Sequence, residues 1–306
     1  MKDLKGRTAV LTGAGSGFGL ECARLGVERG MNLVLVDVQW DALDRAMTEL
    51  QPQARALGSS LSAHCVDVSV AAEMEALAEW VRRNAGPPHF VFNNAGVCCG
   101  GLVWESTPAD WAWVMGVNLM GVVHGVHYFT PMMLEAARDD PCWSGHIVNT
   151  ASMAGLLTPP NMGVYSVSKH AVVAFTETLY QDLKLVSDQI GVSVLCPYFV
   201  ATGIADSKRN RPRVAGGRQP TASQLASEAM LQKAVRSGRV TAADIAQKVF
   251  DALESRQFYI YSHPGSMGAV QARFEDVVQA RNPSDPFADK PELGQQLRTR
   301  LGAISN

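Results

Sequence analysis

The chain has 306 residues, of which 47% are hydrophobic and 18% are charged, and its formal net charge is −2. This composition predicts a sizeable buried core, and the near-balanced charge argues against a nucleic-acid or membrane partner. No apolar run reaches the ~20 residues that span a bilayer, and the six cysteines show no C-x-x-C spacing. Because the first residues lead directly into a predicted strand without a signal-peptide pattern, we expect a cytoplasmic protein with reduced thiols and no metal site.

The first predicted strand, residues 7–12, leads into a glycine-rich turn and then into a helix that ends near Gly30. This order is typical of dinucleotide binding, because glycines let the backbone approach a diphosphate and a helix N-terminus stabilises its charge. The spacing is G-x-x-x-G-x-G, and a plain tight turn is the alternative. The cofactor contacts expected here are Gly13, Ser16, Gly17, Phe18 and Gly19.

The second predicted strand, residues 32–36, ends at Asp37. A carboxylate at this point can accept hydrogen bonds from the adenosine ribose hydroxyls, and it would repel a 2′-phosphate. No Arg or Lys follows Asp37 directly, and Ser16 is not basic, so the sequence favours NAD over NADP. The alternative is that Asp37 caps the next helix, although Asp41 is better placed for that role.

Two further predicted strands, residues 61–66 and 90–92, are followed by candidate cofactor contacts. Asp67 can accept from the adenine amino group, with Val68 beside it, or it can cap the following helix together with Ser69. The small turn after the second strand lets backbone lie against a cofactor and contains Asn94, Ala95 and Gly96.

Residues 107–137 are predicted to form one long helical region that contains Asn118 in an apolar neighbourhood. A buried amide needs hydrogen-bond partners. We therefore expect Asn118 to tie backbone groups at an irregularity in this helix.

An acid/base centre is indicated between residues 152 and 169. Ser152 follows a predicted buried strand over residues 146–150, and Tyr165 and Lys169 lie four apart on one face of the next predicted helix. A nearby ammonium favours the phenolate and lowers a pKa that starts near ~10, and Ser152 can add a hydroxyl donor. Taken alone, Tyr-x-x-x-Lys more often marks an exposed helix face with a snorkelling lysine.

Together, these motifs have the order and spacing of the short-chain dehydrogenase/reductase family, and residues 5 to about 262 resemble its single-domain form. The resemblance implies an α/β, doubly wound Rossmann fold, with a seven-stranded, mostly parallel sheet and helices on both faces. It also implies an NAD-dependent enzyme that transfers a hydride between the cofactor and a secondary alcohol or ketone. In this family pattern Tyr165 is the acid/base, Lys169 lowers its pKa and holds the nicotinamide ribose, Ser152 donates to the carbonyl oxygen, and Asn118 holds a water.

The strand predicted over residues 192–196 leads into Pro197, an expected cofactor contact. Val200 and Thr202 match family positions that hold the nicotinamide carboxamide, whereas Tyr198 stands where the family usually has glycine. Residues 203–240 correspond to the mobile substrate lid of the family. Its basic cluster can meet an acidic substrate, or it can form a solvated face or a loop near the nucleotide. The cluster comprises Lys208, Arg209, Arg211, Arg213 and Arg218.

Residues 265–306, the C-terminal extension, continue past the point where simple family members end. We expect helices over residues 266–281 and 292–301, near the active-site mouth or at a subunit contact, within a single domain of residues 1–306. The candidate pocket wall is apolar and favours a hydrophobic, bulky substrate. This wall comprises Met153, Leu156, Leu157, Met162 and Tyr198.

We expect a small-molecule substrate and a homodimer or homotetramer, because in the family the helices that carry Asn118 and Tyr165 pair across subunits. Two other functions are considered. A nucleotide-sugar epimerase or dehydratase shares Tyr-x-x-x-Lys but usually has another glycine spacing and a larger C-terminal domain. A non-catalytic NAD-binding sensor is disfavoured by the intact Asn-Ser-Tyr-Lys set.

Overall fold

The computed structural model describes residues 1, 3–212 and 219–302, so two arginines of the predicted basic cluster, Arg213 and Arg218, lie outside the described residues. The described chain forms one seven-stranded sheet in the order β3-β2-β1-β4-β5-β6-β7, and every pairing is parallel. The strands are β1 (Thr8–Thr12), β2 (Asn32–Asp37), β3 (Leu61–Cys65), β4 (Phe90–Asn93), β5 (Gly145–Thr150), β6 (Ile190–Cys196) and β7 (Tyr259–Tyr261). The predicted doubly wound α/β fold is confirmed.

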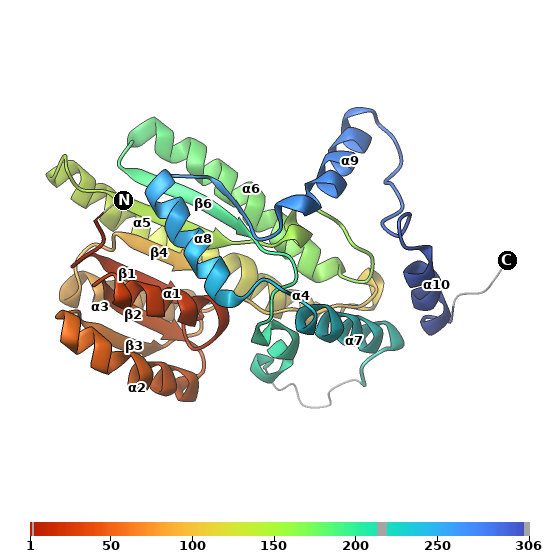
Figure 1. Ribbon diagram of the computed structural model, residues 1–306, viewed down its shortest axis with the longest axis horizontal. Coiled ribbons are helices and arrows are strands. Elements are labelled where there is room, and N and C mark those ends of the chain that lie inside the picture. The colour runs from red at the N-terminus through yellow and green to blue at the C-terminus, as the bar shows by residue number, and fades with distance from the viewer. Residues whose placement is uncertain (2, 213–218, 303–306) are drawn as a thin grey trace.

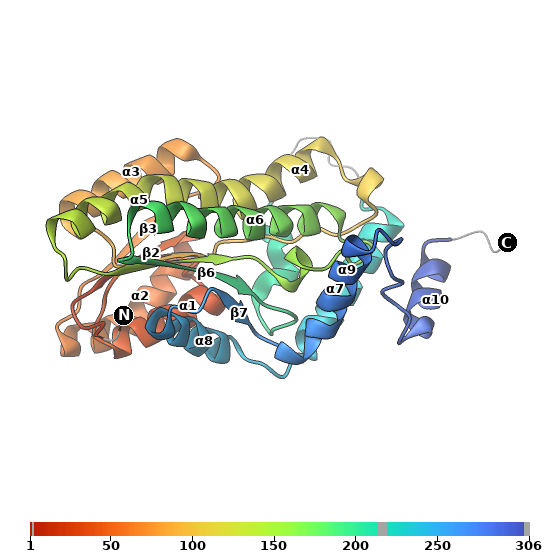
Figure 2. The same ribbon diagram turned by 90° about the horizontal axis from the view of Figure 1, so that it is seen from above.

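Helices cover both faces of the sheet (Figures 1 and 2). One face carries α1 (Gly17–Glu28), α2 (Trp40–Leu57) and α8 (Ala242–Ser255). The other face carries α3 (Ala71–Asn84), α4 (Pro108–Met115), α5 (Gly121–Asp139) and α6 (Gly163–Val186). Because both faces are covered, the strands are near-continuous apolar runs. Leu11 of β1 packs into the core on one face and its neighbour Val10 into the core on the other.

The strand order reverses between β1 and β4, which lie side by side at the centre of the sheet. In open α/β sheets, ligands bind outside the carboxyl ends of the strands at this switch point. The glycine turn follows β1 and the Asn94 turn follows β4, so the fold brings the two predicted cofactor segments together there.

The predicted helical region over residues 107–137 is α4 and α5 joined by a π-helical turn, η2 (Gly116–Met120). The C-terminal extension contains the two predicted helices, as α9 (Met267–Val278) and α10 (Pro291–Arg300). The predicted lid, residues 203–240, contains the 3-10 segment η4 (Gly203–Asn210) and α7 (Ala222–Arg236). α7, α9 and α10 lie beyond the carboxyl edge of the sheet (Figure 2).

Candidate active site

The glycine turn is shaped by close packing that leaves no room for side chains. Gly13 has φ +66, and a Cβ there would lie 3.0 Å from the Cα of Ala95. A Cβ at Gly19 would lie 2.2 Å from the Gly13 carbonyl oxygen, so Gly19 lets α1 begin against the turn. Ser16 is the N-cap residue of α1 but makes no side-chain cap bond. The first amides of α1 are therefore available to an anion.

Asp37 links the glycine turn to the start of α2. Its Oδ2 accepts from the amide of Gly15 at 3.0 Å, and its Oδ1 accepts from the amide of Gln39 at 3.0 Å. The N-cap of α2 is Gln39, and Asp41 lies in the first turn. The proposed capping role of Asp37 or Asp41 is therefore wrong, although Asp37 does hold the backbone just before the helix.

Asp67 makes a local contact with Ser69, whose amide and hydroxyl donate to Oδ1 at 2.9 and 2.7 Å. The N-cap of α3 is Val70, so this pair organises the turn before the helix rather than capping it. Val68 lies beside the pair, 6% exposed.

The turn after β4 is fixed to its neighbours by hydrogen bonds. Thr12 Oγ1 accepts from the amides of Asn94 and Ala95 at 2.9 and 3.1 Å. Asn94 Nδ2 donates to the Thr12 carbonyl, and Thr150 Oγ1 donates to Asn94 Oδ1. A Cβ at Gly96 would lie 3.4 Å from Asn118 Oδ1 and 3.6 Å from Lys169 Nζ. This glycine therefore brings the turn close to the predicted catalytic residues.

Asn118 is fully buried in η2 and makes three hydrogen bonds. Its Oδ1 accepts from Val97 N at 2.8 Å, while Nδ2 donates to Val97 O and to Ser168 Oγ, each at 3.0 Å. The amide thus joins the π turn, the loop after β4 and α6. Such π turns are frequent at functional sites, and the predicted tie at a helix irregularity is what the structure shows.

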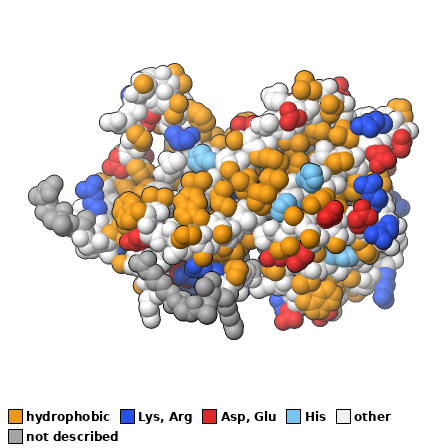
Figure 3. Space-filling view, turned by 180° about the vertical axis from the view of Figure 1, so that it is seen from behind, with side chains coloured by type: hydrophobic (Ala, Val, Ile, Leu, Met, Phe, Trp, Pro, Cys, Tyr) orange, Lys and Arg blue, Asp and Glu red, His pale blue; other side chains and the backbone are white. Residues whose placement is uncertain are grey.

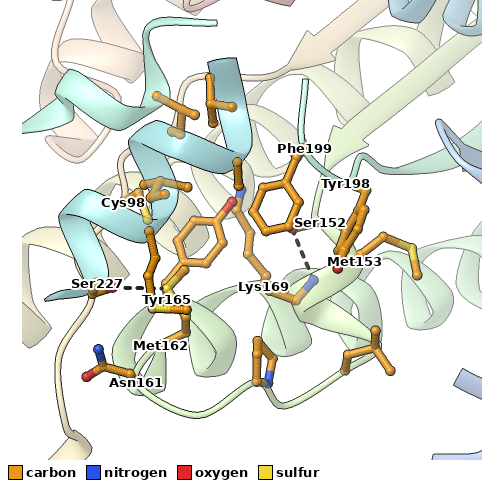
Figure 4. Close-up of a pocket in the computed structure, with 18 of the residues that line it drawn as sticks. Cys98, Ser152, Met153, Asn161, Met162, Tyr165, Lys169, Tyr198, Phe199 and Ser227 are labelled. Atoms are coloured by element: carbon orange, nitrogen blue, oxygen red, sulfur yellow. Dashed lines mark hydrogen bonds between the residues drawn. The ribbon is translucent and has the colours of Figure 1, made fainter. Parts of the chain in front are cut away.

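Tyr165, Lys169 and Ser152 surround one cavity (Figure 4). Lys169 Nζ lies 5.8 Å from the centre of the Tyr165 ring and donates to Thr150 O at 2.8 Å. Ser152 Oγ accepts from Ala154 N at 3.1 Å and donates to Pro197 O at 3.3 Å. The predicted acid/base set is therefore assembled by β5, α6 and the loop after β6.

The electrostatics of this set differ from the expectation. Burial lowers the pKa of Lys169 to about 8. Burial also raises the pKa of the Tyr165 phenol. The prediction of a lowered net pKa for Tyr165 is wrong, because the ammonium is bonded to a backbone carbonyl and desolvation of the phenolate dominates.

Sequence reasoning missed Cys98, whose side chain lies beside Tyr165 (Figure 4). It is 8% exposed, and burial raises the pKa of its thiol to about 12, so it remains neutral. Its position two residues after the Asn94–Gly96 turn is the sequence signal that could have indicated it.

The loop after β6 supplies the next wall. Pro197 O accepts from Met153 N at 2.9 Å, and the ring centres of Tyr198 and Phe199 are 4.4 Å apart with the rings tilted by 47°. Val200 is 2% exposed and packs into the core, which leaves its backbone for any cofactor contact. Thr202 caps η4, and a Cβ at Gly17 would lie 3.4 Å from its Cγ2.

A cavity of about 2290 Å³ runs from the glycine turn past Tyr165. All predicted cofactor and catalytic residues line it except Gly19 and Asn118, which shape the backbone around it. Met153, Leu157, Met162 and Tyr198 also line it, but Leu156 does not. Leu156 is 6% exposed and belongs to a core cluster with Val172, so its predicted place in the pocket wall is wrong.

The described cations of the predicted basic cluster contact the protein itself. Lys208 pairs with Glu228 at 2.5 Å, and Arg209 Nη1 donates to Gly203 O at 3.0 Å. Arg211 pairs with Asp110 at 2.6 Å. These contacts leave little support for the alternative of an acidic substrate at this cluster.

No cluster of metal-ligating side chains occurs within the described ranges, and none of their helices has the length and apolar character to cross a membrane.

Comparison with known proteins gives consistent matches. A family model described as short chain dehydrogenase matches residues 7–213. The CLA biosynthesis dehydrogenase/reductase of Lactiplantibacillus plantarum is 32% identical over 283 residues, which cover 91% of this chain and 95% of that protein. The 1-deoxy-11-beta-hydroxypentalenate dehydrogenase of Streptomyces exfoliatus is 32% identical over 276 residues, covering 90% and 89%. A solved short chain dehydrogenase/reductase from Burkholderia phymatum, in complex with NAD, is 50% identical with a TM-score of 0.87, covering 94% and 99%.

Proposed function

Because the chain belongs to the short-chain dehydrogenase family of oxidoreductases, we propose that it transfers a hydride between NAD and a secondary alcohol or ketone with a bulky, hydrophobic body. The observation that carries this proposal is the placement of Tyr165, Lys169 and Ser152 around a cavity continuous with the glycine turn. The neighbour that binds NAD and the relatives named dehydrogenases support it.

The residues around the glycine turn fit a dinucleotide. Gly13 and Gly19 allow close backbone approach, and the start of α1 offers amides to a diphosphate. Asp37 uses two acceptor positions on Gly15 and Gln39, out of about four that an ionised carboxylate offers. The remaining ones suit ribose hydroxyls, and the negative charge favours NAD over NADP.

The chain's own residues then move and hold protons. In oxidation the Tyr165 phenolate takes the hydroxyl proton of the substrate, and in reduction the phenol returns it. The bond from Ser152 Oγ to Pro197 O is long at 3.3 Å, so this hydroxyl readily turns to donate to the reacting oxygen. The Lys169 ammonium, buried beside the Tyr165 ring, would hold the nicotinamide ribose. The cofactor, when bound, supplies the hydride chemistry that no side chain provides.

The π turn η2 provides the route by which protons exchange with solvent. The Asn118 side-chain amide already donates both of its hydrogens, one to Val97 O and one to Ser168 Oγ. We therefore assign the water expected at Asn118 to the main chain of η2, which the side chain holds in its irregular form.

The test is NADH formation with a panel of secondary alcohols, monitored by absorbance. Turnover of hydrophobic secondary alcohols supports the proposal. Conversion of a nucleotide sugar without net NADH would favour the epimerase, and tight NAD binding without any turnover would favour the sensor. The epimerase is disfavoured because the described C-terminal extension adds only two helices, α9 and α10.

A homodimer or homotetramer is also proposed, through the face formed by α5 and α6. Figure 3 shows apolar side chains gathered on the back of the molecule, where these helices lie. Met120 and Val167 are 39% and 44% exposed there. Sedimentation of Val167→Arg should show smaller particles than wild type, whereas a monomeric wild type would contradict this proposal.

A further inference from the structure

The cavity that contains Tyr165 continues into the C-terminal extension. The outer part of the cavity is lined by residues of α7, α9 and α10. α10 contacts α7, and Figure 1 shows α7 and α9 standing apart from each other. We call this part the α7–α9 groove, lined by Met230, Leu231, Ala269, Ala272, Arg273 and Leu293.

The orientation of α9 follows from its two faces, one of which packs on the protein core while the other lines the cavity. Val270 is 5% exposed and packs in a core cluster with Met153, next to Ser152. Residues 268, 269, 272, 273, 276 and 277 all line the cavity, which is the spacing of one helix face. This face carries the small residues Gly268, Ala269 and Ala272, so α9 leaves space in the cavity that larger side chains would fill.

The facing walls are apolar yet uncovered. Met230 of α7 and Leu293 of α10 are each 38% exposed and line the groove. Exposed apolar side chains that line a concavity beside a reacting centre are typical of a ligand site. The groove therefore suits the apolar part of a substrate whose reacting carbon lies at Tyr165.

The groove also carries unbalanced positive charge. Lining residues between positions 229 and 301 include six Lys or Arg and three Asp. Arg281 pairs with Asp276 at 3.0 Å. Arg273, on the cavity face of α9, has no carboxylate partner among the described residues, and its guanidinium carbon lies 5.5 Å from the Phe274 ring centre. A planar guanidinium without a partner is suited to a carboxylate.

From these observations we propose that the substrate is a hydroxy or oxo acid with an extended apolar body. Its alcohol or ketone lies at Tyr165, its apolar body lies between α7 and α9, and its remote carboxylate pairs with Arg273. This inference rests on the proposed function for the reacting end, but the groove's preference for an acid is a binding property that can be measured separately.

The experiment compares binding of hydroxydodecanoic acid, with its alcohol next to the terminal methyl, and of its methyl ester. Isothermal titration calorimetry gives the dissociation constant of each for the full chain in the presence of NAD. We expect the acid to bind at least about tenfold more tightly than the ester, as one charge-assisted pair would give. Arg273→Gln should abolish that ratio, and Arg236→Gln, on α7 outside the cavity lining, should preserve it.

Steric variants test the path of the apolar body. Ala272→Phe should weaken binding of acid and ester alike by about tenfold or more, because the ring occupies the groove. Ala269→Leu is a milder variant on the same face if the first fails to fold. Val278→Phe adds the same ring on α9 where the residue is 84% exposed and outside the cavity lining, and it should bind both ligands as wild type does.

Equal affinity of wild type for acid and ester, an unchanged ratio in Arg273→Gln, or absence of binding by either ligand would overturn the inference. Turnover of dodecan-2-ol, a hydrophobic secondary alcohol without a carboxylate, is measured in parallel and tests the proposed function by itself. Selective acid binding without any alcohol turnover would contradict the proposed function and leave the α7–α9 groove as an acid-binding site.

Discussion

Asp37 Oδ2 accepts a hydrogen bond from the amide of Gly15 at 3.0 Å, so the carboxylate proposed to select the cofactor also holds the glycine turn. We expect wild type to use NAD at least about tenfold better than NADP. Two like charges within ~4 Å cost about 1 kcal/mol even in bulk water, and hydrogen bonds to a charged acceptor contribute about 1.5–3 kcal/mol. The measurement is kcat/KM for both cofactors.

Asp37→Asn removes the charge while its single amide oxygen can still accept from Gly15, although the hydrogen bond from Gln39 is lost. Its NAD preference should fall at least about tenfold, and Asp41→Asn is the matched control. Arg209 Nε lies 3.5 Å from Gln39 Oε1, two residues after Asp37 in the chain. If this guanidinium meets a 2′-phosphate, Arg209→Gln should further reduce any NADP use. Equal use of both cofactors by wild type would refute the selecting role of Asp37.

The predicted lid, residues 203–240, contacts α4 through Arg211 and Asp110. Their charged groups are 2.6 Å apart, Asp110 is 1% exposed, and Arg211 lies over the Trp113 ring at 5.9 Å. Arg211→Ala leaves a buried carboxylate with less compensation, so we expect a loss of about 1–3 kcal/mol in the free energy of unfolding. We also expect η4, which lines the cavity through Ser207 and Arg209, to be held less firmly, which raises KM for the alcohol more than it lowers kcat.

Urea unfolding and steady-state kinetics check this prediction, with Arg211→Lys as a partial rescue of charge and Arg82→Ala as an exposed control on α3. Arg82 pairs with Glu135 at 3.6 Å on the surface, where such pairs contribute little. Identical unfolding and KM in Arg211→Ala and wild type would show that the pair does not hold the lid.

Burial of Lys169 makes stability depend on pH in a defined direction. The pKa of Lys169 falls from 10.5 to about 8 in the folded chain. Between these values the unfolded chain keeps a proton that the folded chain has released, so the contribution of this group to stability rises with pH across that window. The raised pKa of Tyr165 acts in the opposite direction, but only above its ordinary value of 10.

Urea unfolding of wild type and Lys169→Met, repeated across pH 8 to 10.5, measures this effect. The free energy of unfolding of wild type relative to the variant should increase over the window. Lys184→Met on the same helix, where Lys184 pairs with Asp188 at the surface, should give a profile parallel to wild type. A parallel profile for Lys169→Met itself would show that burial does not depress this lysine.

The features that the sequence predicted best depend on local spacing. The order of strand, glycine turn and helix predicted the positions of Gly13 and Gly19 in the turn. The four-residue spacing predicted that Tyr165 and Lys169 lie on one face of α6. These relationships follow from element geometry and do not require knowledge of tertiary packing.

The features that it could not predict depend on contacts between distant segments. Arg211 and Asp110 are far apart in the chain, and no local pattern indicates their pairing. Leu156 has the same apolar character as Leu157, yet only the latter faces the cavity. The net direction of the Tyr165 pKa depends on burial, which overrides the nearby charge that the spacing suggested.

The central claim is that Tyr165 is the proton carrier of a dehydrogenase, and Tyr165→Phe tests it most directly. The variant keeps the ring and removes the hydroxyl, so NADH formation from a secondary alcohol should fall by at least ~10²–10⁴-fold, while NAD binding followed by fluorescence stays nearly unchanged. Tyr180→Phe, on the same helix but outside the cavity lining, should retain wild-type turnover. Turnover of Tyr165→Phe within a few-fold of wild type would contradict the account.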